Sequence, residues 1–157
     1  MPRGFSLFEL MIVVVIVGAL AALAIPKFSI VRDSNNVGGA RARMESTIAT
    51  ARAAAIHKGR LSVFTVSGNW ISVRTQNPTT GLMQYQVRPF DLSAVYPGVQ
   101  IQVGGPGITN IWYEPRGLTW SGAKPTGTLV FRVIGHTKRD SVCVTRQGQL
   151  LPRGCAL

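Results

Sequence analysis

Residues 5–25 read FSLFELMIVVVIVGALAALAI, and this stretch decides how the rest of the chain is organised. Only Ser6 and Glu9 interrupt its apolar character. An α-helix rises about 1.5 Å per residue, so the stretch makes about 30 Å of helix, the thickness of the hydrocarbon core of a bilayer. The sequence therefore predicts one helix that crosses a membrane.

Glu9 is the one ionisable residue of this apolar stretch. A carboxylate inside a membrane is costly unless it has a partner, and the stretch supplies no cation, so we expect the partner on another molecule. Two simpler interpretations stay open: a secretory signal peptide cut at Ala19–Ala21 or Ala22–Ala24, and a plain signal anchor. Against the signal peptide, the apolar run exceeds the usual ~7–15 residues and the basic leader is only Met1–Gly4.

The sequence from Gly4 to Leu10, GFSLFEL, closely resembles the prepilin cleavage and methylation motif of type IV pilins and type II secretion pseudopilins. The resemblance implies that a prepilin peptidase removes the leader, residues 1–4, by cutting after Gly4, and methylates the new amino terminus of Phe5. It also implies that Glu9 meets the N-terminal amine of a neighbouring pilin during filament assembly. An ammonium is the partner that a membrane-buried carboxylate lacks. Pro26 lies where members of the family kink this helix.

The same resemblance implies a cellular location. It makes residues 5–26 a single-pass transmembrane and assembly helix in the bacterial inner membrane, with the globular domain in the periplasm or outside the cell in a filament. The distribution of basic residues does not support this orientation, because four of them follow the span within residues 27–43 and only Arg3 precedes it. The orientation therefore rests on the resemblance.

The composition is strongly basic. The 157 residues include 17 Lys and Arg against 6 Asp and Glu, for a net charge of +11, and loss of Arg3 with the leader would leave 16 − 6 = +10 before the new amine is counted. Such a balance favours polyanions such as nucleic acid, lipopolysaccharide or anionic lipid, or serves solubility alone. About 130 residues beyond the span are enough to bury the core of one modest domain.

Cys143 and Cys155 are the two cysteines of the chain. If the domain is exported, these cysteines can form a disulfide that closes a short loop near the C-terminus, and two free thiols are the alternative. A bridge of that size stabilises a domain by about 3 kcal/mol in the loop-entropy model.

Beyond Pro26 the apolar pattern becomes that of an amphipathic helix, which we expect over residues 27–59, ending near Lys58 with Gly59 as its C-cap. The apolar face recurs at three- and four-residue steps: Val37, Ala40, Met44, Ile48, Ala51 and Ala55. Gly38 and Gly39 each weaken a helix by about 1 kcal/mol relative to alanine, so they predict a hinge or melted turn unless packing holds them.

The sequence pattern of residues 60–157 is typical of strands and turns. Alternating or apolar segments predict strands at 61–66, 70–75, 82–88, 99–103, 108–113, 127–134 and 141–146, with a short last strand at 149–151. Gly and Pro cluster between them. We expect the helix to cover one face of an antiparallel sheet, an α+β fold.

Three segments of the domain narrow the resemblance to the GspH/FimT group of minor pilins and pseudopilins. They read YEPRG at 113–117, GTLVFR at 127–132 and VCVTRQG at 142–148. The resemblance implies a type IV pilin-like fold and a structural subunit of a type II secretion pseudopilus or a type IV pilus.

Catalytic chemistry has little support in this sequence. His57 lies at the predicted helix end and His136 in a Gly-His-Thr turn, and neither has a Cys or carboxylate at the spacing of metal ligands. Phosphate-loop and nucleophile-elbow patterns are missing from the sequence. We therefore expect a protein that is no enzyme and needs no cofactor or metal.

An alternative function is DNA capture at a pilus tip. Some FimT-like minor pilins bind DNA for natural transformation through a C-terminal Gly-Arg-x-Arg pattern, but residues 148–151 here read GQLL. Four basic residues nearby offer a substitute patch: Lys138, Arg139, Arg146 and Arg153. Basic side chains contact phosphates and nearby aromatics can stack on unpaired bases, so a patch of this kind favours DNA as a partner.

Overall fold

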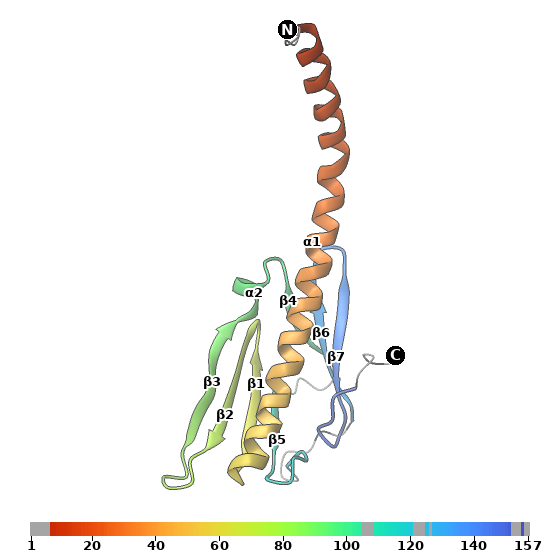
Figure 1. Cartoon of the computed structure of the whole chain (residues 1–157). Coiled ribbons are helices and arrows are strands. Elements are labelled where there is room, and N and C mark those ends of the chain that lie inside the picture. Colours follow the sequence, from red (N-terminus) through yellow and green to blue (C-terminus); the bar gives the residue numbers. More distant parts are fainter. Residues whose placement is uncertain (1–6, 105–108, 121–124, 126, 152–154, 156–157) are drawn as a thin grey trace.

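The structure is a computed structural model that describes residues 7–104, 109–120, 125, 127–151 and 155. One long helix, α1 (Leu7–Lys58), precedes a β-rich domain that contains one short helix, α2 (Leu92–Val95). The strands are β1 (Ser62–Ser67), β2 (Trp70–Gln76), β3 (Met83–Asp91), β4 (Gln100–Gly104), β5 (Asn110–Tyr113), β6 (Leu129–Ile134) and β7 (Arg139–Val144). Figure 1 shows the C-terminal half of α1 lying along the domain while its N-terminal half extends beyond it.

The domain half of α1 buries the face that the sequence predicts. All six residues of that face, from Val37 to Ala55, are at most 1% exposed and belong to the core cluster. The helix ends at Lys58, and Gly59 follows with a φ of 60°, the left-handed conformation of a glycine C-cap. The N–H of Arg60 closes the cap by donating to the carbonyl of Ala55 at 3.2 Å. The predicted helix end is confirmed.

The strands form two sheets rather than the single sheet expected from the sequence. One has the order β3-β2-β1-β5 and the other β4-β6-β7, and every pairing is antiparallel. The long-range pair β1–β5 places Ser62 opposite Tyr113, a connection that strand periodicity alone does not reveal. Phe64 of the first sheet and Phe131 of the second meet edge to face at 6.0 Å, so the two sheets share one core under α1.

Gly38 and Gly39 do not form a hinge, because α1 is continuous through both. A Cβ on Gly39 would lie 2.5 Å from Cε1 of Tyr96, so the tyrosine ring packs against bare helix backbone at this point. A Cβ on Gly38 would meet nothing within 4 Å. Packing therefore explains Gly39 and leaves Gly38 without a structural reason.

Two of the three segments that carry the family resemblance, 113–117 and 142–148, meet beside the C-terminal end of α1. Tyr113 is fully buried, and its hydroxyl donates to the carbonyl of Gly148 at 3.2 Å. Gly148 has a φ of 84°, and a Cβ there would lie 2.6 Å from Cε1 of Tyr113. Nε of Arg52 donates to the carbonyl of Gly117 at 2.8 Å, which fixes the segment 113–117 to the helix.

The remaining differences from the sequence-based prediction are local. α2 was not predicted, although Asp91 gives the usual signal: its carboxylate caps the helix by accepting from the N–H of Ser93 at 2.9 Å. The predicted strand at 149–151 is only an isolated bridge between Val144 and Leu150. Among the described residues, β5 begins at Asn110 and β6 at Leu129.

Candidate functional site

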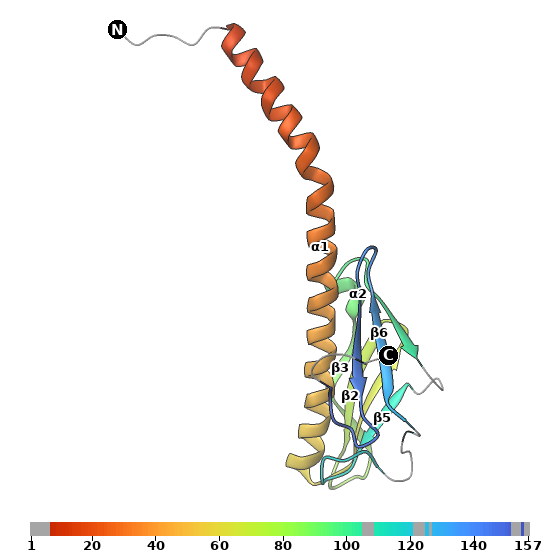
Figure 2. The same ribbon diagram turned by 90° about the vertical axis from the view of Figure 1, so that its right-hand side faces the viewer.

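The candidate site is the uncovered N-terminal half of α1. From Leu7 to Val17 the exposed fraction of each apolar side chain lies between 45% and 80%, and the apolar stretch of this helix buries nothing against the domain. Among the described residues, α1 is the one helix long and apolar enough to cross a membrane. Figure 2 shows this half standing clear of both sheets. Such a surface needs lipid or other apolar helices around it.

Glu9 lies in the first turn of α1 and is exposed. A carboxylate at this position interacts favourably with the positive end of the helix dipole. The cleavage and methylation residues, Gly4 and Phe5, lie outside the described residues.

The backbone of α1 is helical through Pro26, so the chain is not broken there. Figure 2 shows that the N-terminal half of α1 leans away from the axis of the half that packs on the domain. Proline removes one helical hydrogen bond and is a common cause of such bending. A kink at Pro26 stays a prediction.

Asp33 binds the turn between β6 and β7, residues 135–138, to α1. Thr137 donates to its carboxylate from the hydroxyl and the backbone N–H, both at 2.7 Å, and the N–H groups of His136 and Lys138 add two bonds at 3.0 Å. The bonds from Thr137, followed by those from His136 and Lys138, hold the pKa of Asp33 well below its usual range, although desolvation acts in the opposite direction. The turn is therefore held by a charged carboxylate.

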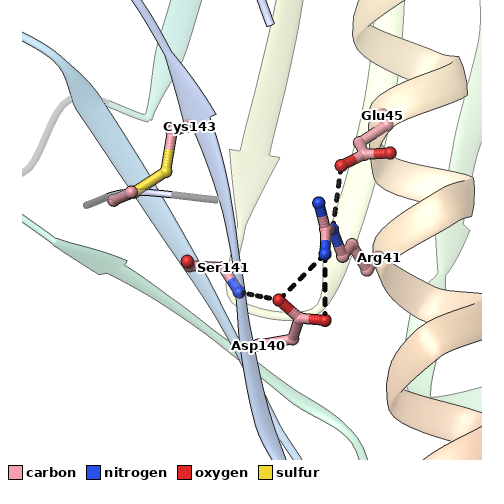
Figure 3. The surroundings of a disulfide bond; sticks show 6 residues. Arg41, Glu45, Asp140, Ser141 and Cys143 are labelled. Carbon is pink, nitrogen blue, oxygen red and sulfur yellow. Dashed lines mark hydrogen bonds and ion pairs between the residues drawn. A yellow bond between two sulfur atoms is a disulfide. The ribbon is translucent and has the colours of Figure 1, made fainter. Parts of the chain in front are cut away.

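Arg41 forms a second polar link, between α1 and β7. Its Nε lies 2.9 Å from Oε1 of Glu45, and its Nη1 lies 3.2 Å from both carboxylate oxygens of Asp140. The two carboxylates raise the pKa of Arg41 further, so it stays charged. Figure 3 shows the guanidinium between its two acids, with the N–H of Ser141 donating to Asp140 from the side of β7.

Cys143 and Cys155 are joined in a disulfide, with their Cα atoms 5.5 Å apart. Cys143 is fully buried in β7, so the bridge ties the C-terminal segment to the second sheet. A disulfide of this kind persists in an oxidising compartment.

Among the described residues, the structure separates one predicted DNA-binding residue, Arg146, from two others, Lys138 and Arg139. Lys138 ends the β6–β7 turn and Arg139 begins β7, whereas Arg146 follows the other end of that strand. Seven residues of extended chain from Arg139 to Arg146 span about 23 Å. Arg153 lies outside the described residues. DNA binding by these residues stays a prediction, in which Arg146 would act apart from Lys138 and Arg139. Arg139 instead lines a cleft of about 550 Å³ with Arg132.

Nothing in the described residues assembles a reaction centre. They contain no group of three or more His, Cys, Asp or Glu that could hold a metal ion. His57 lies in the last turn of α1 and His136 in the exposed β6–β7 turn, far apart in the fold. The groove beside the end of α1, of about 510 Å³, is lined mainly by apolar side chains such as Ile48, Ile56 and Leu150.

The contacts by which Asp33 and Arg41 hold α1 to the second sheet were not predicted from the sequence. Asp33 and Arg41 contact residues about 100 positions further along the chain, and nothing local marks them. Arg41 and Glu45 are spaced as a helical i, i+4 pair, which is the one signal available from the sequence.

Two family models match the chain. The first, described as the prokaryotic N-terminal methylation motif, matches residues 2–25, and the second, described as type II transport protein GspH, matches residues 40–148. A search of curated proteins gave no match.

Solved structures with a similar fold include two crystal forms of the type IV minor pilin FimU of Pseudomonas aeruginosa. The first has a TM-score of 0.56 at 12% identity and covers 75% of this chain and 88% of FimU. The second has a TM-score of 0.53 at 14% identity and covers 73% and 92%. At these identities the likeness shows the fold, which is that of a type IV pilin: a long apolar N-terminal helix on antiparallel sheets.

The GspH model spans well over half of the 157 residues, and the methylation motif overlaps the apolar half of α1 from Leu7 onward. The members of this family and the structural neighbours are filament subunits, which confirms the expectation that the chain is no enzyme. The chain belongs to the GspH family of pilin-like proteins and carries their N-terminal methylation motif.

Proposed function

We propose that this chain is a minor subunit of a type II secretion pseudopilus or a type IV pilus. A prepilin peptidase cuts after Gly4 and methylates Phe5. The mature chain is then anchored in the inner membrane by its single transmembrane helix until it joins the filament. The proposal rests on one observation. The domain does not cover the apolar surface of the N-terminal half of α1, and this surface carries one carboxylate, that of Glu9, near its start. Such a surface fits a helix that leaves lipid for a bundle of like helices.

Glu9 sets how far neighbouring subunits are offset from each other along the filament axis. In lipid, its carboxylate is stabilised by a cation, and the amine created by cleavage is a cation at the same depth. Two chains side by side can pair the amine of one with the Glu9 of the other. The attraction is much stronger in the low dielectric of the membrane than in water, so it favours one axial offset between neighbours.

The globular domain lies on the outer side of the inner membrane in this proposal. The disulfide between Cys143 and Cys155 supports export, because such bridges are rare in reducing compartments. DNA capture at a filament tip is the weaker alternative, since Arg146 lies at the opposite end of β7 from Lys138 and Arg139.

The first test is the intact mass and amino-terminal residue of the protein recovered from host membranes. The proposal expects a chain that starts at N-methylated Phe5. An uncut chain that starts at Met1, or one that starts near Ile25, would contradict it, because the first has no free amine on Phe5 and the second has lost Glu9 itself.

The second test replaces Glu9 by Gln, which keeps the size of the side chain and removes its charge. We expect E9Q to be cut and inserted normally, with incorporation into sheared filaments reduced at least tenfold. E114Q is the matched control, because it removes a carboxylate from the domain, outside the span, and should leave incorporation unchanged. Normal assembly of E9Q would rule out the ammonium–Glu9 pair.

A further inference from the structure

The end of the domain nearest the apolar half of α1 is formed by turns that are tied to one another and to the helix. The β6–β7 turn is fixed to Asp33, and the carbonyl of Pro97 accepts from Nδ2 of Asn36 at 2.9 Å. A Cβ on Gly98 would lie 3.3 Å from the His136 ring, so the two turns touch. Figure 2 shows the β6–β7 turn beside α1 at this end. The turns at this end are therefore bound both to one another and to α1.

Three exposed basic residues lie at this end of the domain or just beyond it: Lys27 and Arg32 on α1, and Lys138 in the β6–β7 turn. We call them the basic collar. None of the three forms an ion pair with any described residue, and Nζ of Lys138 donates only to the hydroxyl of Ser34, at 3.0 Å. The collar keeps its charge available for a partner.

The acids near the collar are already engaged. Asp33 accepts four hydrogen bonds from the β6–β7 turn, and Asp140 accepts from Arg41. On the exposed side of the same helical turns, Phe28 is 72% and Val31 56% exposed. Basic groups beside exposed apolar side chains are typical of a surface that meets the interface of a membrane.

Measured along the axis of α1 from Ile25, the basic collar lies at the level of the lipid headgroups. At about 1.5 Å per residue, Lys27 lies about 3 Å and Arg32 about 10 Å beyond Ile25, where the apolar run ends. Headgroups occupy about 5–8 Å outside the hydrocarbon core of each leaflet. Lys138 contacts Ser34, about 13 Å beyond Ile25, so it lies within one Debye length, about 8 Å, of that layer.

We propose that the basic collar binds the anionic phospholipid headgroups of the bilayer that α1 spans, so that the domain rests against the membrane before assembly. The inference depends on the proposed function in requiring residues 5–26 to span the bilayer. The occupant follows from position and charge, because headgroup phosphates are the anions that the span itself brings to the collar.

The test uses the full mature chain in lipid nanodiscs that contain a trace of lipid with a gadolinium headgroup. Discs of phosphatidylcholine are compared with discs that also contain phosphatidylglycerol, and the paramagnetic relaxation of backbone amides is measured. We expect relaxation at Thr137 and Lys138 to be several-fold larger in anionic discs, and relaxation at Gly59 and Arg60, at the far end of α1, to be equal in both. In 1 M salt, where the Debye length is about 3 Å, the difference should disappear.

The test variant is R32E/K138E, and the matched control is K58E/R60E, which changes the net charge equally at the far end. The docked-to-free ratio should fall about fivefold for each basic residue lost, and the control should behave as the wild type. If R32E/K138E loses its folded amide spectrum, R32Q/K138Q replaces it with the same expectation.

Equal relaxation in the two kinds of disc would overturn the inference while leaving the proposed function intact. The same holds if the collar variant and the control respond alike, or if R32E/K138E loses only incorporation into filaments, which would identify an acidic neighbouring subunit as the partner. Failure of the wild type to insert into either disc would overturn the membrane anchoring and the inference together.

Discussion

At the scale of single residues, Asp33 shows how one charge can hold a turn to a helix. Its carboxylate accepts four hydrogen bonds from Thr137, His136 and Lys138, and none of these donors has a comparable acceptor if the acid is protonated or replaced. Because these bonds favour the ionised form, the pKa of Asp33 is lowered in the folded state.

The lowered pKa predicts how stability depends on pH. The unfolded chain has an ordinary Asp pKa of about 3.9, so the stabilisation is complete above that value and is lost as the pH falls below it toward the lower pKa of the folded state. We expect the melting temperature of the wild type, in detergent, to fall between pH 4 and pH 2. D33N should melt several degrees lower at pH 7 and show less pH dependence over this interval.

Asp91 is the control for this prediction. Its carboxylate accepts from the N–H and hydroxyl of Ser93 at the start of the four-residue α2, away from the β6–β7 turn. D91N should therefore lower the melting temperature less than D33N and keep the acid dependence of the wild type. Equal pH profiles for D33N and the wild type would show that Asp33 is not the titrating group.

At the scale of elements, the two adjacent glycines of α1 predict opposite effects of the same change. G38A should stabilise the protein by up to about 1 kcal/mol, because alanine favours a helix and its Cβ meets nothing. G39A should destabilise it by about 1–2 kcal/mol, because its Cβ would overlap the ring of Tyr96. Urea denaturation of each variant measures the difference.

Removing the ring tests the cause of this difference. In the double variant G39A/Y96A the overlap disappears, so the alanine at position 39 should cost nothing relative to Y96A alone. If G39A destabilises the protein equally with and without the Tyr96 ring, the close approach of the ring is not the reason for the glycine.

The disulfide is the covalent link between β7 and the C-terminal segment. Its two cysteines are 12 residues apart, and reduction of such a loop should lower the free energy of unfolding by about 3 kcal/mol. Urea denaturation with and without reductant checks this value. C143A/C155A is the control and should be unaffected by reductant; a wild type that is equally unaffected would contradict the prediction.

The elements also show what the sequence can predict. The apolar face from Val37 to Ala55 and the end of α1 at Lys58 follow from helical periodicity and a C-cap glycine, which are local signals. The division into two sheets depends on which distant strands pair, such as Ser62 with Tyr113, and alternation within a strand carries no information about its partner.

The same distinction applies to the candidate site. The span, Glu9 and the cleavage motif lie within the first 26 residues and can be identified locally. The DNA-binding prediction grouped residues that are close in sequence, whereas β7 separates Arg139 from Arg146. The basic collar was not predicted, since Lys138 is brought to α1, where it contacts Ser34, by the turn that Asp33 holds.

At the scale of the whole molecule, α1 serves two environments with one continuous helix. Among the side chains that the structure describes, those of its apolar half are exposed as far as Val31, while burial begins at Asp33 and the core at Val37. The residues that hold the domain together thus begin only after the span has ended. We therefore expect the domain to fold without the span, provided that Asp33 and Val37 are kept.

Two truncated chains test this boundary. A chain of residues 27–157 should be a soluble monomer, with its disulfide formed and a melting temperature within a few degrees of that of the full chain in detergent, because it loses no core residue. A chain of residues 38–157 should melt at least about 10 °C lower, because it loses the Asp33 bonds to the β6–β7 turn and the buried Val37 side chain. Light scattering and thermal melts distinguish the two. If the chains melt alike, the β6–β7 turn does not depend on α1, and the rigid connection between the domain and the membrane span would have to arise elsewhere.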